Sequence, residues 1–284
     1  MKQTLFLCTL CCWVLFAQGQ AGAPLPYTDE DGEQYVYGDS VFVRSHASLQ
    51  AMVIDTLLAG HLVTIVERKK ELATLKGISA PWIAVTYEKE GQQRQGCLWS
   101  GLLALKPLRR GNTKFVYGVE TVLHKKEKAG NEYFTTYDFI IGLKVLVENQ
   151  KVAHQQFKLD EGQSAAFTNA VISDGKGLTG LKNIVALHFT GEACGIPALT
   201  YRFGWNGEQL VALPLQTGIS DAGVFYHTEE LIFPADAKGK TDTIIWLMEE
   251  GEQTEQYDKK GEPIYKVKKS KKTFPWNGTS FTAG

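Results

Sequence analysis

The chain has 284 residues, of which 44% are hydrophobic and 21% are charged, and its formal net charge at pH 7 is −1. These values are typical of an ordinary globular protein with one large or two smaller domains. Nucleic-acid binding needs many Lys and Arg residues to neutralise phosphates, so the nearly neutral charge gives that function no support.

The N-terminus has the three parts of a secretory signal peptide. A short basic start is followed by an apolar run at residues 4–17, and small residues stand at Ala17, Gly19 and Ala21. The run is shorter than the roughly 20 residues of a membrane-spanning helix, so a membrane anchor is the weaker interpretation. We expect residues 1–21 to be removed, the mature protein to be periplasmic or secreted, and no stable insertion into a membrane.

Residues 22–39 contain Pro24, Pro26 and an acidic stretch at 29–33. The Asp-x-Asp-Gly order in this stretch is similar to the opening of a calcium loop, whose carboxylates alternate so that they point at one cation. The later ligands and the closing glutamate of such a loop are missing at the required spacing. We therefore expect a solvated leader and no metal site.

Between residues 40 and 106, short runs of β-branched and aromatic residues alternate with turns, which indicates strands. Val41 and Val43 are separated by one residue, as in a strand with one buried face. Each run is too short to be stable alone, so closure into a small barrel is expected. The expected strands lie at residues 41–44, 53–57, 62–66, 82–87 and 96–103.

The order of these runs resembles that of a bacterial SH3-type (SH3b) domain. Residues 43–45, Val-Arg-Ser, match the initial Val-Arg-x signature of the family, and residues 82–85, Trp-Ile-Ala-Val, match its aromatic-x-x-Val strand. The chain departs from the family at Cys97, where an aromatic residue is usual, and at residues 68–81, which have the character of an insertion. The resemblance implies a module that binds peptidoglycan or a peptide and does not catalyse.

Residues 107–112 interrupt the apolar pattern with Pro, Arg and Gly and predict a linker. The rest of the chain, residues 113–284, contains many strand-sized runs, which favours a second, antiparallel β domain of sandwich or propeller-like form. Asn-Gly pairs at 206–207 and 277–278 predict hairpin turns. The expected strands lie at residues 115–123, 133–146, 152–159, 184–190, 200–203, 209–213, 224–233, 243–248 and 264–269.

The candidates for ligand binding are Trp82, Tyr87 and Trp99, whose rings combine apolar area with a polar group that suits a peptide or a sugar. Core packing is the favoured interpretation for Trp82, and both interpretations remain open for Trp99, because its orientation depends on the strand register. His46 is added because it falls in the first loop of the barrel, beside the expected groove.

Cys97 and Cys194 remain after signal-peptide cleavage. They either form a disulfide, as an oxidising compartment permits, or are small apolar residues without a bond. The alternative function is a cell-wall peptidase or amidase that uses Cys194 as its nucleophile, with His154, His188 or His227 as the base. Against this alternative, Cys194 lies in a loop-like segment with no helix after it to activate a thiolate.

The six histidines stand singly, without His-x-x-x-His or Cys-x-x-Cys spacing, so we expect neither a metal site nor a cofactor. The lysine run at 266–272 suits either an anionic surface or an edge strand protected from aggregation, and the edge strand is favoured. The sequence thus predicts an all-β protein, a small SH3-like barrel followed by a larger antiparallel β domain. Its expected function is non-catalytic binding of peptidoglycan or a peptide or protein ligand in the cell envelope.

Overall fold

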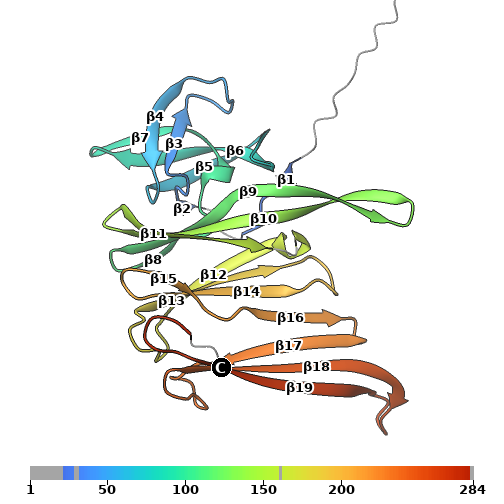
Figure 1. The fold of residues 1–284 in the computed structure, drawn as a ribbon. Coiled ribbons are helices and arrows are strands. Elements are labelled where there is room, and N and C mark those ends of the chain that lie inside the picture. The colour runs from blue at the N-terminus through green and yellow to red at the C-terminus, as the bar shows by residue number, and fades with distance from the viewer. Residues whose placement is uncertain (1–21, 29–31, 160–161, 282–284) are drawn as a thin grey trace, which may run out of the picture.

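The computed structural model describes residues 22–28, 32–159 and 162–281, and the predicted signal peptide lies outside them. The fold is all-β, as predicted: the described residues form strands in three sheets and two short 3₁₀ turns. Figure 1 shows a barrel-like sheet at the top, a four-stranded sheet beneath it and an eight-stranded sheet at the bottom.

The first sheet has the strand order β2-β5-β6-β7-β3-β4, and β1 pairs with β6. It curls around its own apolar cluster, which includes Val41, Val43, Val63 and Val85. The alternation of Val41 and Val43 therefore identified the inward face correctly. The strands are β1 (Ala23–Pro24), β2 (Glu33–Tyr35), β3 (Ser40–Arg44), β4 (Val53–Leu58), β5 (Leu62–Leu75), β6 (Ile78–Lys89) and β7 (Gln92–Trp99).

The prediction of a solvated leader is wrong for part of residues 22–39, whereas Pro24, Tyr27, Glu33 and Asp39 are exposed. Ala23 lies in β1 and is fully buried, and β2 pairs with β5 along Glu33, Gln34 and Tyr35. The physical reason is that the side chains of Tyr35, Val36 and Tyr37 are large and apolar or aromatic. The second sheet covers Tyr35 and Tyr37, and the barrel core covers Val36. The Asp-x-Asp part of the acidic stretch lies outside the described residues.

Residues 68–81 lie mostly in strands and do not form the enlarged loop that was expected. They belong to one long hairpin, because β5 extends to Leu75 and β6 begins at Ile78. Lys76 and Gly77 form the turn, with φ of 53° and 78°. Positive φ at both central residues is the conformation that joins two twisted antiparallel strands through a tight turn.

The second sheet has the order β11-β10-β9-β8. Three of its strands confirm predicted runs, and the fourth corrects one prediction: Arg109 and Arg110 of the expected linker lie in β8, paired with β9. Its strands are β8 (Leu108–Arg110), β9 (Thr113–Ala129), β10 (Glu132–Val147) and β11 (Gln150–Leu159).

The third sheet has the order β12-β13-β14-β16-β17-β18-β19, with β15 paired to β14. The Asn206-Gly207 pair lies in a hairpin between β14 and β15, as predicted, but the turn spans residues 206–209 and Gly207 alone of the pair has positive φ. The lysine run lies on the edge strand β19. Its strands are β12 (Phe167–Asp174), β13 (Asn183–Thr190), β14 (Ala198–Trp205), β15 (Leu210–Ala212), β16 (Gln216–Asp221), β17 (Phe225–Ile232), β18 (Thr243–Tyr257) and β19 (Pro263–Pro275).

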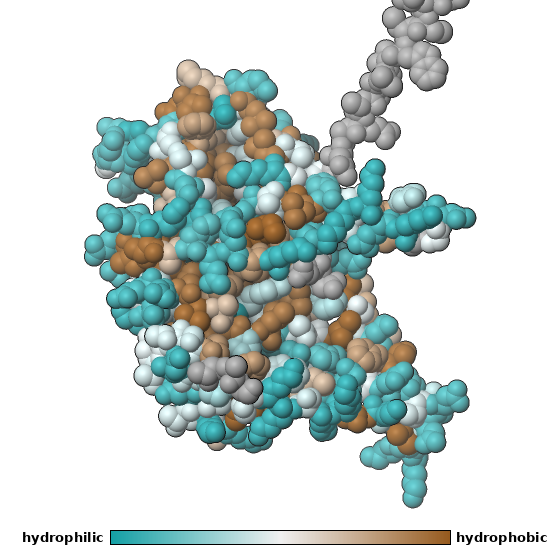
Figure 2. Space-filling model, viewed as in Figure 1, coloured by the Kyte–Doolittle hydropathy of each residue, from teal (hydrophilic) through white to brown (hydrophobic). Residues whose placement is uncertain are grey.

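One apolar cluster connects all three sheets. It contains Trp82 and Trp99 from the barrel, Phe115 and Ile141 from the second sheet and Phe203 from the third. The second sheet therefore packs against the third across a shared core, an arrangement that agrees with the sandwich-like alternative. Figure 2 shows that the long hairpin of β9 and β10, which extends beyond this core, is mostly hydrophilic.

The ring of Tyr37 joins the barrel to the second sheet. It lies on Gly118 of β9 and Gly142 of β10, which face each other in the strand register. A Cβ atom on Gly118 would lie 2.7 Å from Cγ of Tyr37, so both strands need glycine here. The Tyr37 hydroxyl donates a hydrogen bond to Glu120, which also accepts one from Nε2 of His154 at 2.7 Å.

Lys144 stabilises the same contact between Tyr37 and the second sheet. This lysine is buried, and its Nζ atom lies 4.1 Å from the centroid of the Tyr37 ring. It donates hydrogen bonds of 2.9 Å to the Tyr37 carbonyl and to Asp39. A hydrogen bond from Lys151, assisted by Lys144, outweighs partial burial and lowers the pKa of Asp39 to about 2.

We expect Gly118→Ala to destabilise the protein by about 1–3 kcal/mol, because the added methyl group overpacks the Tyr37 ring. Urea unfolding followed by circular dichroism measures the change. Gly218→Ala is the control, since the nearest atom to its Cβ would be 3.8 Å away. Equal unfolding midpoints for the two variants would show that the Tyr37 contact does not limit stability.

Candidate binding site

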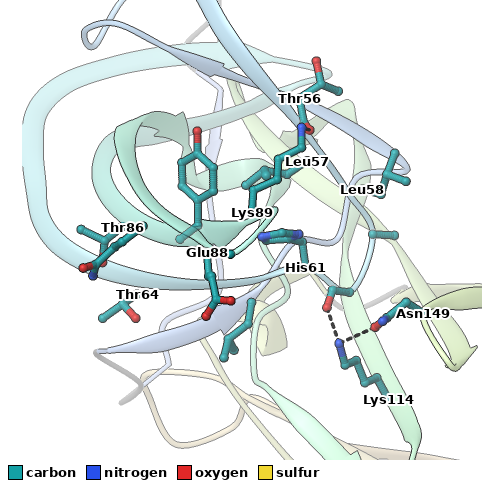
Figure 3. Close-up of a pocket in the computed structure, with 16 residues that line it drawn as sticks. Thr56, Leu57, Leu58, His61, Thr64, Thr86, Glu88, Lys89, Lys114 and Asn149 are labelled. Atoms are coloured by element: carbon teal, nitrogen blue, oxygen red, sulfur yellow. Dashed lines mark hydrogen bonds between the residues drawn. The ribbon is translucent and has the colours of Figure 1, made fainter.

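A groove of about 1160 Å³ lies on the barrel. It is formed by the end of β4, the turn at residues 59–61, and the neighbouring parts of β5 and β6. Lys114 of β9 and Asn149 of the β10–β11 turn close one side, as Figure 3 shows. The groove therefore lies where the barrel meets the second sheet.

His61 occupies the middle of the groove (Figure 3). The turn before it depends on Gly60, whose φ is 78° and whose amide donates a 2.8 Å hydrogen bond to the Val36 carbonyl. The His61 ring meets the Tyr87 ring edge-on at 6.0 Å. Burial lowers the pKa of His61 below its usual value, which favours the neutral form of its ring.

Lys114 supplies positive charge at one side of the groove. Its Nζ atom donates 2.7 Å hydrogen bonds to the Gly60 carbonyl and to Oδ1 of Asn149, and lies 4.9 Å from the Tyr35 ring centroid. Burial and then the nearby Arg109 lower the pKa of Lys114. No carboxylate forms an ion pair with Lys114 within the described part of the chain. Its charge is therefore available to an anionic group of a ligand.

Apolar side chains form another part of the groove wall. Leu58 is 63% exposed and Leu62 is 40% exposed, although both are large and hydrophobic. The threonines 56, 64 and 86 and Glu88 lie between and around them. A surface with exposed leucines beside a cation can hold a peptide by both its apolar side chains and a carboxylate.

A buried carboxylate supports the groove from beneath. Asp55 accepts hydrogen bonds from the Tyr87 hydroxyl at 3.1 Å, from Arg94 at 2.9 Å and from Lys89. Burial alone would raise the pKa of Asp55, but these bonds and one from the Thr56 amide outweigh it, and the net pKa is lowered. Burial and then the bond to Asp55 raise the pKa of Tyr87 to about 12.

The structure corrects the predicted aromatic groove. Trp82 and Trp99 are 3% and 2% exposed, and they face each other across β6 and β7 inside the shared core. The Trp99 indole donates to the carbonyls of Ala73 and Ala80, both at 3.0 Å. These tryptophans are therefore core residues, because the second sheet covers the face of the barrel on which they stand.

The other two predicted site residues have different positions. Tyr87 does line the groove, although its ring is mostly covered. His46 is exposed in the loop between β3 and β4, where its Nδ1 atom lies 3.2 Å from the Ser45 hydroxyl, and it is not part of the groove. Of the predicted site residues, only Tyr87 therefore lines the groove. The sequence did not indicate His61, Lys114 and Asn149, which line it as well.

Cys97 and Cys194 do not form a disulfide; Cys97 is buried and Cys194 is exposed. The three candidate bases have other partners: His154 bonds Glu120 at 2.7 Å, His188 bonds Thr200 at 3.0 Å and His227 bonds Glu229 at 3.0 Å. No described histidine forms a hydrogen bond to Cys194. Among the described residues, no cluster of three or more His, Cys, Asp or Glu side chains is arranged to hold a metal ion.

No known family, curated protein or solved structure matches this chain. The SH3-type resemblance therefore stays a prediction that rests on the residues quoted for it. Within the described ranges, no helix is both long enough and apolar enough to cross a membrane.

We expect Asp55→Asn to destabilise the protein by about 1–3 kcal/mol at pH 7, because the amide replaces a buried carboxylate that accepts charged hydrogen bonds. The folded-state pKa of Asp55 lies below its ordinary value of 3.8, so its stabilising effect is present above that pH and is lost as the pH falls through the folded pKa. Urea unfolding at pH 7 and pH 3 measures this, and the gap between wild type and variant should be smaller at pH 3. An equal gap at both pH values would contradict the assignment.

Proposed function

We propose that the protein is a non-catalytic binding protein of the cell envelope, and that its SH3-like barrel holds a cell-wall peptide or another peptide ligand. The groove around His61 carries this proposal. It combines the exposed leucines 58 and 62 with the ammonium of Lys114, which has no carboxylate partner in the described chain.

A peptide suits this combination better than a purely apolar ligand. The leucines offer contact area to an apolar side chain, at about 25 cal/mol for each Å² removed from water. A carboxylate of the peptide would pair with Lys114 in a partly buried setting, where charge-assisted hydrogen bonds are stronger than neutral ones. Lys89 is already paired with Asp55, so the carboxylate is expected at the Lys114 side.

The peptide component of peptidoglycan carries both amides and carboxylates and is therefore the first ligand to test. The predicted signal peptide at residues 1–21 supports a periplasmic or secreted location, where this polymer would be accessible. Binding needs no covalent step: the His61 ring packs edge-on against the Tyr87 ring, so its role is to support the groove.

We expect Lys114→Gln and Leu58→Ser each to weaken retention on purified cell-wall sacculi by about tenfold, which corresponds to about 1.4 kcal/mol. The measurement is a sedimentation assay with the mature protein over a series of sacculus concentrations. Thermal melting of each variant verifies that it is folded.

Matched controls come from β9, outside the groove. Leu123→Ser and Lys126→Gln make the same chemical changes at exposed positions and should bind as the wild type does. Retention that falls equally in all four variants would contradict the groove as the binding site. A folded wild type that stays in solution at every sacculus concentration would contradict the cell-wall ligand.

A further inference from the structure

A second hollow, of about 700 Å³, lies between the N-terminal segment and the barrel. Residues 22–28 form one wall; they are fixed by the pairing of β1 with β6 and by a bridge between Tyr27 and Phe167 of the third sheet. Gln34 of β2, parts of β5 and β6 and residues between 100 and 105 form the rest. This hollow shares no residue with the groove around His61.

The wall of this hollow is mainly apolar. Pro24 and Leu25 come from the N-terminal segment, Ile65 and Leu72 from β5, and Leu103 from the chain after β7. Leu72 is 66% exposed, which is unusual for a large apolar side chain beside a hollow. An apolar hollow with a few polar groups is the usual form of a small-molecule site.

Two buried polar groups in this wall have no hydrogen-bond partner in the described structure. They are Oε1 of Gln34 and the hydroxyl of Ser100. Gln34 is 3% exposed and Ser100 is 7% exposed, and both residues line the hollow. Buried polar groups in folded proteins are almost always paired, so two unpaired groups in one wall require a physical reason.

The fold explains why these side chains are buried. Gln34 stands opposite Val63 in the β2–β5 register, and its neighbour Tyr35 faces the second sheet. Ser100 begins the 3₁₀ turn after β7, and its carbonyl accepts a 3.0 Å hydrogen bond from the Leu103 amide. Their backbones are thus fixed in the wall of the hollow, which both residues line.

We propose that this hollow is a second binding site, which takes a small, mainly apolar molecule that carries an amide group. The amide N–H donates to Oε1 of Gln34, and the amide carbonyl accepts from the Ser100 hydroxyl. One functional group thereby satisfies both unpaired atoms, while leucine and proline side chains contact the apolar part. This site is independent of the proposed peptide groove.

The test uses a pair of probes, 4-methylpentanamide and its methyl ester analogue, methyl 4-methylpentanoate, with the mature full chain. The two have similar apolar bodies, but the ester has no N–H to donate. Ligand-observed saturation-transfer NMR gives the dissociation constant of each. We expect the amide to bind at least tenfold more tightly than the ester, because a buried acceptor left unpaired disfavours the ester.

Gln34→Leu and Ser100→Ala should each weaken amide binding at least tenfold. Without the probe, Gln34→Leu should unfold at the same or a higher urea concentration than wild type, because the substitution removes an unpaired acceptor. Gln150→Leu, an exposed change in β11, is the matched control and should bind the amide normally. Ser100→Ala keeps the test decisive if Gln34→Leu does not fold.

Three results would overturn the proposal. The first is equal affinity for the amide and the ester in the wild type, or no binding of either. The second is unchanged amide binding in a folded Gln34→Leu or Ser100→Ala variant. The third is a lower unfolding midpoint for Gln34→Leu without the probe, which would show that an internal water already pairs Oε1 in the free protein.

Discussion

The contact of the Tyr37 ring with the Gly118–Gly142 pair is the constraint on which the rest of the structure depends. Two facing glycines leave the surface of the second sheet open at one point, and the ring from the barrel fills it. Glu120 and Lys144 then fix the hydroxyl and the carbonyl of Tyr37. Because Lys114 lies on the same strand as Gly118, this contact also determines where its ammonium meets the Gly60 turn.

Local patterns were sufficient to predict most strands, because alternation and turn chemistry act over a few residues. The run at 133–146 and the Asn206-Gly207 hairpin are examples. The sequence did not predict strands β12 and β16. Phe167–Asp174 and Gln216–Asp221 include several polar residues, and they form strands because they pair with neighbouring strands. Residues 33–37 look like part of a polar leader; the burial of Tyr35 and Tyr37 depends on a sheet that begins only at Leu108.

The groove was harder to predict than the strands, for a related reason. Alternation shows which residues share a face of β6 and β7, but it does not show that a second sheet covers the face with Trp82 and Trp99. His61, Lys114 and Asn149 come from three distant segments and carry no common motif. One local feature does lie at this site: Gly60 stands between two apolar runs and has the positive φ of the turn that presents His61.

The core that runs from Trp82 through Phe115 to Phe203 has a consequence for the evolutionary history of the chain. Modules that are exchanged between genes normally carry a complete core, so each can fold wherever it is inserted. A cut at residues 107–112 would instead divide one core between two fragments and expose apolar surface on both. The barrel and the sheets that follow it are therefore expected to be inherited together, and the barrel to occur with this particular partner wherever its sequence is found.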